Sequence, residues 1–159
     1  MGNQLAIDAG PAHEPLLNDT IGANLARTIA AHGDNDALVS RHQGIRWSYT
    51  EFGERVRRLA SGLLGLGLET GDRVGLWSPN HAEWTLLQYA TAEIGVILVN
   101  INPSYRTHEL AYALQQSGCR WVIAAPDFKS SHYVEMIADV SDDCPDLEHA
   151  VCFWTEEWN

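Results

Sequence analysis

Five polar residues in two short loops are the candidates for ligand binding. They are Asn80, His81, Asn102, Tyr105 and Arg106. Each loop directly follows an apolar run, and amide, imidazole, phenol and guanidinium groups can all hydrogen-bond a carboxylate or a phosphate. No nucleophile stands beside a base, and Pro and Asn in these loops also suit turns, so we favour a turn-forming role over direct catalysis. The sequence therefore predicts loops at the edge of a substrate site, and no catalytic residue.

Histidine and cysteine spacing gives no indication of a metal site. The seven His are scattered, and the three Cys, at positions 119, 144 and 152, form no Cys-x-x-Cys pair. Zinc sites and disulfide frameworks both have recognisable spacings, and neither occurs here. We expect no bound metal, and a reducing, cytoplasmic compartment is the simplest expectation.

Charge is distributed unevenly along the 159 residues. Residues 1–129 hold thirteen acidic and ten basic side chains, whereas residues 130–159 hold eight acidic and none basic. Nucleic-acid binding needs a basic surface, and the short cluster Arg55, Arg57 and Arg58 is more typical of the solvated side of a helix. We therefore expect no nucleic-acid partner. No apolar stretch is long enough to span a bilayer, so we also expect a soluble chain with no transmembrane segment.

Three apolar runs alternate with two helical patterns in the middle of the chain. The runs are Arg73 to Trp77, Val96 to Ile101 and Trp121 to Ala125. Such runs are typical of strands buried on both faces, and the helical segments between them are long enough to serve as parallel crossovers. The sequence predicts an α/β fold with a partial doubly wound parallel sheet and flanking helices. In such sheets ligands bind beyond the carboxyl ends of the strands, where both candidate loops lie.

The flanking segments predict further elements. Residues 1–16, rich in Gly, Pro and Ala, are expected to form a loose N-terminal arm. After it, Thr20 is the expected N-cap of a first helix that closes at Gly33. Beyond Gly33 we expect a β-hairpin and a second helix from Thr50. Of the two crossover helices, the later one is expected to be capped by Thr107, and after the last apolar run we expect a helix at 130–140 and a strand at 149–154.

Several stretches then resemble one enzyme family. The segment from Trp47 to Phe52, continued by Gly71 to Val74, resembles the first core motif of the AMP-forming acyl-adenylate synthetases. Ala92 to Gly95, followed by Val99 to Pro103, is similar to the second core motif. The run Asn102 to Arg106 is the most specific piece and has the form seen in fatty-acyl-CoA ligases, particularly the medium-chain branch. The resemblance extends from about Leu17 to Trp154.

This resemblance implies an activity for a longer protein. Members of the family use ATP, Mg²⁺ and CoA to convert a fatty acid into an acyl-adenylate and then an acyl-CoA thioester. The phosphate-binding loop and the catalytic lysine of the family have no counterpart here, since the one lysine is Lys129. The resemblance thus implies that residues 17–159 are the N-terminal portion of an AMP-binding domain, truncated before the phosphate loop.

Three expectations follow for the isolated chain. It carries no catalytic residue, binds none of the cofactors tightly, and has the remainder of the ligase as its partner. Two alternatives stay open. The whole protein could be an aryl-acid–CoA ligase of the same superfamily, or the chain could be a binding module that keeps the fold without catalysis.

Overall fold

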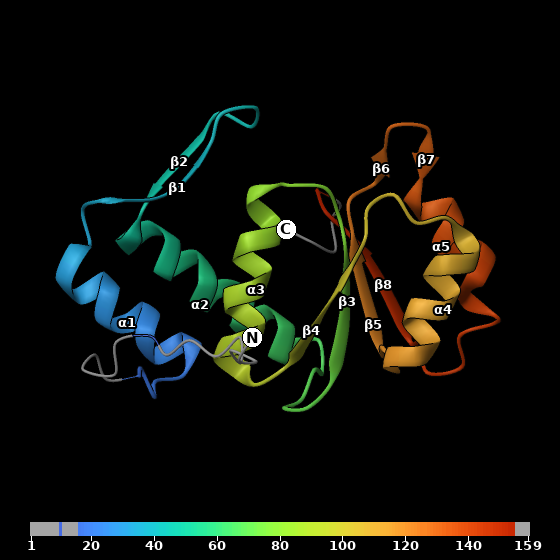
Figure 1. The fold of residues 1–159 in the computed structure, drawn as a ribbon, viewed down its shortest axis with the longest axis horizontal. Coiled ribbons are helices and arrows are strands. Elements are labelled where there is room, and N and C mark those ends of the chain that lie inside the picture. Colours follow the sequence, from blue (N-terminus) through green and yellow to red (C-terminus); the bar gives the residue numbers. More distant parts are fainter. Residues whose placement is uncertain (1–9, 11–15, 155–159) are drawn as a thin grey trace, which may run out of the picture.

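A four-stranded parallel sheet forms the centre of the molecule (Figure 1). The computed structural model describes residue 10 and residues 16–154. Its strands lie in the order β4-β3-β5-β8, and all three pairings are parallel. Their bounds are β3 Arg73–Trp77, β4 Ile97–Ile101, β5 Trp121–Ala124 and β8 His149–Cys152. The parallel sheet predicted from the three apolar runs is therefore confirmed.

Helices cover both faces of this sheet. Helices α2 (Tyr49–Gly65) and α3 (Ala82–Ile94) lie on one face, and α4 (Thr107–Ser117) and α5 (Tyr133–Ser141) on the other (Figure 1). The central strand is consequently apolar on both sides: its consecutive residues Leu76 and Trp77 point to opposite faces, and both are completely buried. Because a parallel sheet is sandwiched between helices, its strands read as continuous apolar runs instead of alternating ones.

The strand order places a topological switch at the centre of the sheet. From β3 the chain crosses to β4 on one side, and after β4 it returns past β3 to β5 on the other side. The connections leaving β3 and β5 therefore run to opposite faces and leave a crevice beyond their carboxyl ends, the usual place for a ligand in open α/β sheets.

The N-terminal elements are the helix and the hairpin that the sequence predicts. Helix α1 (Ile21–His32) begins after Thr20, whose side chain accepts a hydrogen bond from the backbone N–H of Ala23. Strands β1 (Asp36–Ser40) and β2 (Ile45–Ser48) form the predicted antiparallel hairpin. Most of the predicted arm at 1–16 falls outside the described residues.

Several predicted boundaries are wrong by a few residues. Helix α2 begins at Tyr49, one residue before the expected start. It begins there because Ser48 and Glu51 form a reciprocal capping box. Thr107 is the first residue of α4, not its cap. The helix expected from residue 130 begins at Tyr133, because the preceding residues form a small hairpin of β6 (Asp127–Phe128) and β7 (Ser131–His132).

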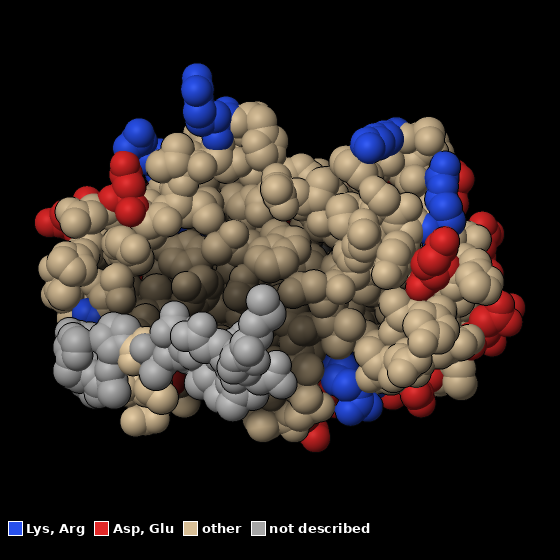
Figure 2. Space-filling view, viewed as in Figure 1, with Lys and Arg blue, Asp and Glu red and all other residues tan. Residues whose placement is uncertain are grey.

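Charge gathers on particular parts of the surface. Figure 2 shows acidic side chains along the side of α4 and α5, while Arg41 and Lys129 lie in the turns of the two hairpins. The same face is hollowed between the β1–β2 hairpin and the α4–α5 side. Among the described residues, no helix has the length and apolar character needed to cross a membrane.

Candidate functional site

Trp77 joins the two candidate loops at the carboxyl edge of the sheet. It is the last residue of β3 and is completely buried. Its indole N–H donates to the backbone carbonyl oxygen of Asn102, just beyond β4, with a nitrogen-to-oxygen distance of 3.0 Å. The end of the central strand therefore holds the backbone of the neighbouring loop.

Tyr133, the first residue of α5, supports the same loop from the layer that α4 and α5 form. Its ring stacks on Trp77 with centroids 3.6 Å apart and planes 13° apart. Its hydroxyl donates to the carbonyl oxygen of Pro103. Burial, together with the charge of Asp127, raises the pKa of Tyr133 to about 12, so the hydroxyl keeps its proton and remains a donor at neutral pH.

The loop after β4 is built as a turn. The backbone N–H of Tyr105 donates to the carbonyl oxygen of Asn102 at 3.0 Å, and the Asn102 side chain accepts from the N–H of Ser104 at 2.9 Å. The side chain of Asn102 thus stabilises its own turn, as we favoured from the sequence. Tyr105 is 36% exposed, and the neighbouring Ser104 and Arg106 are exposed as well.

Arg106 connects this loop to the second hairpin. Its guanidinium donates to the hydroxyl of Ser131 at 2.8 Å, across 25 positions of sequence. Its backbone N–H donates to the carboxylate of Glu109, and hydrogen bonds from the backbone of Glu109 and Arg106 lower the pKa of that carboxyl. Arg106 therefore holds the β6–β7 hairpin through its side chain and the start of α4 through its backbone N–H.

The other two candidates line a separate hollow. Asn80 and His81 border a space of about 240 Å³ between the β1–β2 hairpin and the start of α3, together with Arg41, His42 and Thr85. The rings of His81 and His42 lie with centroids 5.5 Å apart. Burial lowers the pKa of His81, the Glu83 carboxylate opposes that change, and the nearby His42 adds to it.

Gln43 holds the parts of this hollow together, a role that no motif in the sequence indicates. Its side-chain oxygen accepts from the backbone N–H of Ala82 and from the hydroxyl of Ser40, each at 2.8 Å. Its amide nitrogen donates to Glu83 at 2.8 Å. Since His81 precedes α3 without making a side-chain cap, Gln43 caps that helix from 39 positions away.

The five predicted residues thus form two groups at one edge. Asn80 and His81 lie together beside His42, while Asn102, Tyr105 and Arg106 lie together near Tyr133. Among the residues described, no hydrogen bond joins a side chain of one group to a side chain of the other. The link between the groups is Trp77, which is adjacent to Ser78 in one loop and bonded to Asn102 in the other.

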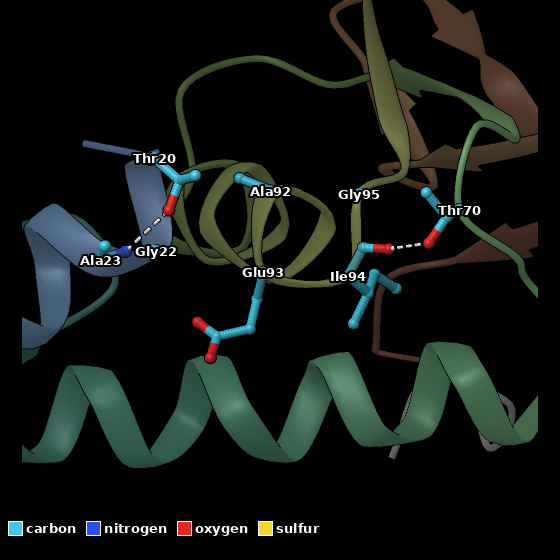
Figure 3. Close-up of a pocket in the computed structure, with 8 residues that line it drawn as sticks. All are labelled: Thr20, Gly22, Ala23, Thr70, Ala92, Glu93, Ile94 and Gly95. Carbon is cyan, nitrogen blue, oxygen red and sulfur yellow. Dashed lines mark hydrogen bonds between the residues drawn. The ribbon is translucent and has the colours of Figure 1, made fainter. Parts of the chain in front are cut away.

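A larger hollow lies at the opposite, amino-terminal edge of the sheet (Figure 3). It measures about 450 Å³ and is lined by Thr20, Gly22, Ala23, Thr70, Ala92, Glu93, Ile94 and Gly95. The hydroxyls of Thr20 and Thr70 are already bonded to backbone groups, at Ala23 and Ile94 respectively. Among the described residues that line this hollow, Glu93 is the one ionisable side chain, and together they do not form the convergent set of polar groups that a substrate site has.

The described part of the chain does not fit a site for ATP with a metal ion. It contains no group of three or more His, Cys, Asp or Glu side chains placed to hold a cation. Lys129 lies over the ring of Phe128, with its ammonium nitrogen 5.0 Å from the centroid, in the β6–β7 turn. No step of phosphate chemistry can be derived from these residues.

Comparison with known proteins identifies the family. A family model described as AMP-binding enzyme matches residues 25–157. The chain belongs to this family. The match covers both loops at the carboxyl edge and all four strands of the sheet, so the family resemblance of the core motifs is confirmed.

Curated relatives of this AMP-binding chain include vertebrate ligases. The medium-chain acyl-CoA ligase ACSF2, mitochondrial, of Mus musculus is 41% identical over 141 residues, which is 89% of this chain and 22% of the mouse protein. The Danio rerio protein of the same name is 40% identical over the same length. The chain therefore spans about a fifth of the length of these relatives.

Solved structures of similar proteins contain the same fold. A fatty acyl CoA synthetase of Mycobacterium tuberculosis superposes with a TM-score of 0.77 at 27% identity, covering 84% of this chain and 26% of that one. A long-chain-fatty-acid-CoA ligase of Archaeoglobus fulgidus superposes with a TM-score of 0.83, covering 98% of this chain and 31% of that one. At 21% identity the second likeness supports the fold alone.

Proposed function

We propose that this chain is the N-terminal part of an ATP-dependent fatty-acid–CoA ligase that works through an acyl-adenylate. The observation that carries the proposal is the 41% identity to a medium-chain acyl-CoA ligase over 89% of the chain, within a family match that covers most of it. Medium-chain fatty acids are the proposed substrates, because the vertebrate relatives are named for them. ATP, Mg²⁺ and CoA are the proposed cofactors of the whole enzyme.

The contribution of this chain to such an enzyme is structural. It supplies a sheet whose carboxyl edge is fixed by Trp77, Tyr133 and Gln43, against which the remainder of the ligase packs. The residues that would stabilise charge on a transferring phosphate or a developing adenylate are proposed to lie in that remainder. On this proposal the chain alone is inactive and holds none of the cofactors tightly.

The candidate loops would border the approach of the acid or of CoA. Asn80 is exposed and Tyr105 presents part of its phenol to solvent, so both are available to a ligand. In the whole enzyme, Asn80→Ala and Tyr105→Phe should lower kcat/KM for acid, ATP or CoA. Unchanged constants for all three substrates in both variants would contradict this assignment.

The main experiment uses a protein of the length of the relatives. The coding DNA after the codon for Asn159 should be read in all three frames, and the longest encoded ligase expressed and assayed for pyrophosphate release with octanoate, palmitate and benzoate. The proposal expects ATP- and CoA-dependent turnover that is fastest with octanoate. Preference for benzoate would favour an aryl-acid ligase, and absence of turnover with every acid would contradict the ligase function.

A matched assay of the 159-residue chain tests the binding-module alternative. The ligase proposal expects no pyrophosphate release, together with strong binding of a hydrophobic dye where partner elements would pack. A monodisperse chain that binds no dye would favour a self-standing module. The proposed compartment is the cytoplasm, supported by the buried free thiols of Cys119 and Cys144, and the mitochondrial names of the vertebrate relatives supply the alternative location for a localisation experiment.

A further inference from the structure

Four segments that are distant in the sequence meet at the start of α3. Gln43 of the β1–β2 turn bonds to the backbone of Ala82 and to the carboxylate of Glu83. The other carboxylate oxygen of Glu83 accepts from the indole N–H of Trp154, 71 positions later, at 2.9 Å. His81 lies between these contacts, with its ring edge-on to that of Trp154 at a centroid distance of 5.1 Å. The hairpin, the loop after β3, α3 and the segment after β8 therefore share one cluster.

A polar contact places Nδ1 of His81 against Ser78. The Ser78 hydroxyl lies 2.8 Å from the carbonyl oxygen of Pro79, to which it can donate, and 3.3 Å from Nδ1 of His81. With the hydroxyl donating to Pro79, Nδ1 carries a proton, and Nε2 is the position at which His81 takes up a second one.

The backbone at Trp154 is held in an unfavourable conformation. Its φ of 63° lies in the left-handed region, which is costly for a residue with a β-carbon. The bond to Glu83 and the contact with His81 offset that cost, while the side chain remains 49% exposed. The bond to Glu83 and the ring contacts with His81 and Phe153 thus hold a strained backbone in place.

Burial opposes a second proton on His81, and the nearby charges act in both directions. His42 and Arg41 come from the hairpin turn and line the same hollow, and the amino end of α3 adds partial positive charge. Glu83, from α3, is the one nearby carboxylate that acts in the other direction. Burial has the largest effect, and the net result is a pKa lowered from the ordinary value of 6.5.

We propose that this cluster is an acid-opened latch, in which proton uptake by His81 releases Trp154 from Glu83 and from the start of α3. In the closed state Trp154 covers one side of the neutral imidazole. In the open state water reaches the ring, and the left-handed backbone at Trp154 relaxes.

The pH range follows from the direction of the His81 shift. Because its pKa is lower in the closed state than in a solvated histidine, the open state binds the proton more tightly. The closed latch is therefore fully favoured above pH 6.5, and it loses stability as the pH falls below that value.

The test follows two signals in the 159-residue chain by NMR between pH 8 and pH 5. One is the ring of His81, and the other is the indole N–H of Trp154, assigned by its loss in Trp154→Phe. We expect both signals to titrate together. In Trp154→Ala, the pKa of His81 should rise toward 6.5, because its cover is gone. In His81→Gln, the indole signal should no longer shift with pH in this range.

His108→Gln is the matched control, since His108 is an exposed histidine at the start of α4, away from the cluster. It should leave both titrations unchanged. The alternative is that the Trp154 ring stabilises the imidazolium by a cation–π contact. A His81 pKa that falls or stays constant in Trp154→Ala would support the cation–π contact and overturn the latch. An indole signal in the parent chain that does not change with pH would also overturn the latch.

Discussion

The indole nitrogen of Trp77 lies 3.0 Å from the carbonyl oxygen of Asn102, and its ring lies flat on that of Tyr133. Two successive carbonyls of the loop after β4, those of Asn102 and Pro103, therefore accept hydrogen bonds from two stacked aromatic side chains. One donor comes from the central strand and the other from α5. The position of the loop consequently depends on packing between the sheet and a helix that follows 30 residues later.

Replacing Trp77 by Phe removes the hydrogen bond to Asn102 and part of a completely buried ring. A phenyl ring can still stack on Tyr133, and the carbonyl oxygen of Asn102 keeps the backbone N–H of Tyr105 as a donor. We expect the free energy of unfolding to fall by about 1–3 kcal/mol, from the lost hydrogen bond together with the smaller buried ring. Urea denaturation of both proteins measures the change. A Trp77→Phe protein as stable as the parent would show that water replaces the indole at no cost.

Tyr133 gives this region a pH dependence at the alkaline end. Its pKa is raised to about 12 by burial and by Asp127, compared with about 10 for an unfolded chain. The folded state therefore favours the neutral phenol, and its contribution to stability is complete below pH 10 and is lost as the pH rises toward 12. A spectrophotometric phenolate titration should show a late step near pH 12. That late step should be absent in Tyr133→Phe, and its persistence there would assign it to another tyrosine.

The main sheet was predictable because its signals are local. The apolar runs at β3, β4 and β5 predict strands buried on both faces, and the intervening helices are long enough for parallel crossovers. The expected burial is found in β3 and β5, whereas β4 lies at the edge of the sheet and its Ile97 is 50% exposed. The carboxyl-edge placement of the candidate loops followed from that topology alone. By contrast, the sequence around Ser131 is typical of a helix N-cap. In the structure Ser131 lies in β7, and its hydroxyl accepts a hydrogen bond from the guanidinium of Arg106. Its partner is 25 positions away, so no nearby residue indicates it.

Gly95 ends helix α3 and also lies close to Thr70, which is distant in the sequence. It ends α3 with a φ of 73°, and a β-carbon there would lie 2.8 Å from Cγ2 of Thr70. Gly95→Ala should therefore lower the free energy of unfolding by about 1–3 kcal/mol, from backbone strain and overlap together. Gly62→Ala is the matched control, because that helical position faces open space and should gain about 0.5–1 kcal/mol. Thermal unfolding of the two variants should move in opposite directions, and a stabilised Gly95→Ala would contradict the structure.

Gln43 is the residue whose replacement should separate the hairpin from the rest of the fold. Its side chain caps α3 through Ala82 and holds Glu83, and both contacts cross about 40 positions of sequence. Gln43→Ala removes a helix cap, which costs about 0.5–2 kcal/mol, and leaves the amino end of α3 without that acceptor.

Amide hydrogen exchange resolves where this loss occurs. The amides of β1, β2 and the first turn of α3 should exchange faster in Gln43→Ala, while those of β3 and β5 keep their protection because the central sheet does not depend on the cap. Gln115→Ala is a suitable control, since Gln115 also donates from its side chain to a distant carbonyl, that of Asp143, on the far face of the sheet. Faster exchange throughout the sheet in Gln43→Ala would mean that the hairpin and the sheet unfold as one unit, and unchanged exchange at the hairpin would show that its packing on α2 and α3 holds it without Gln43.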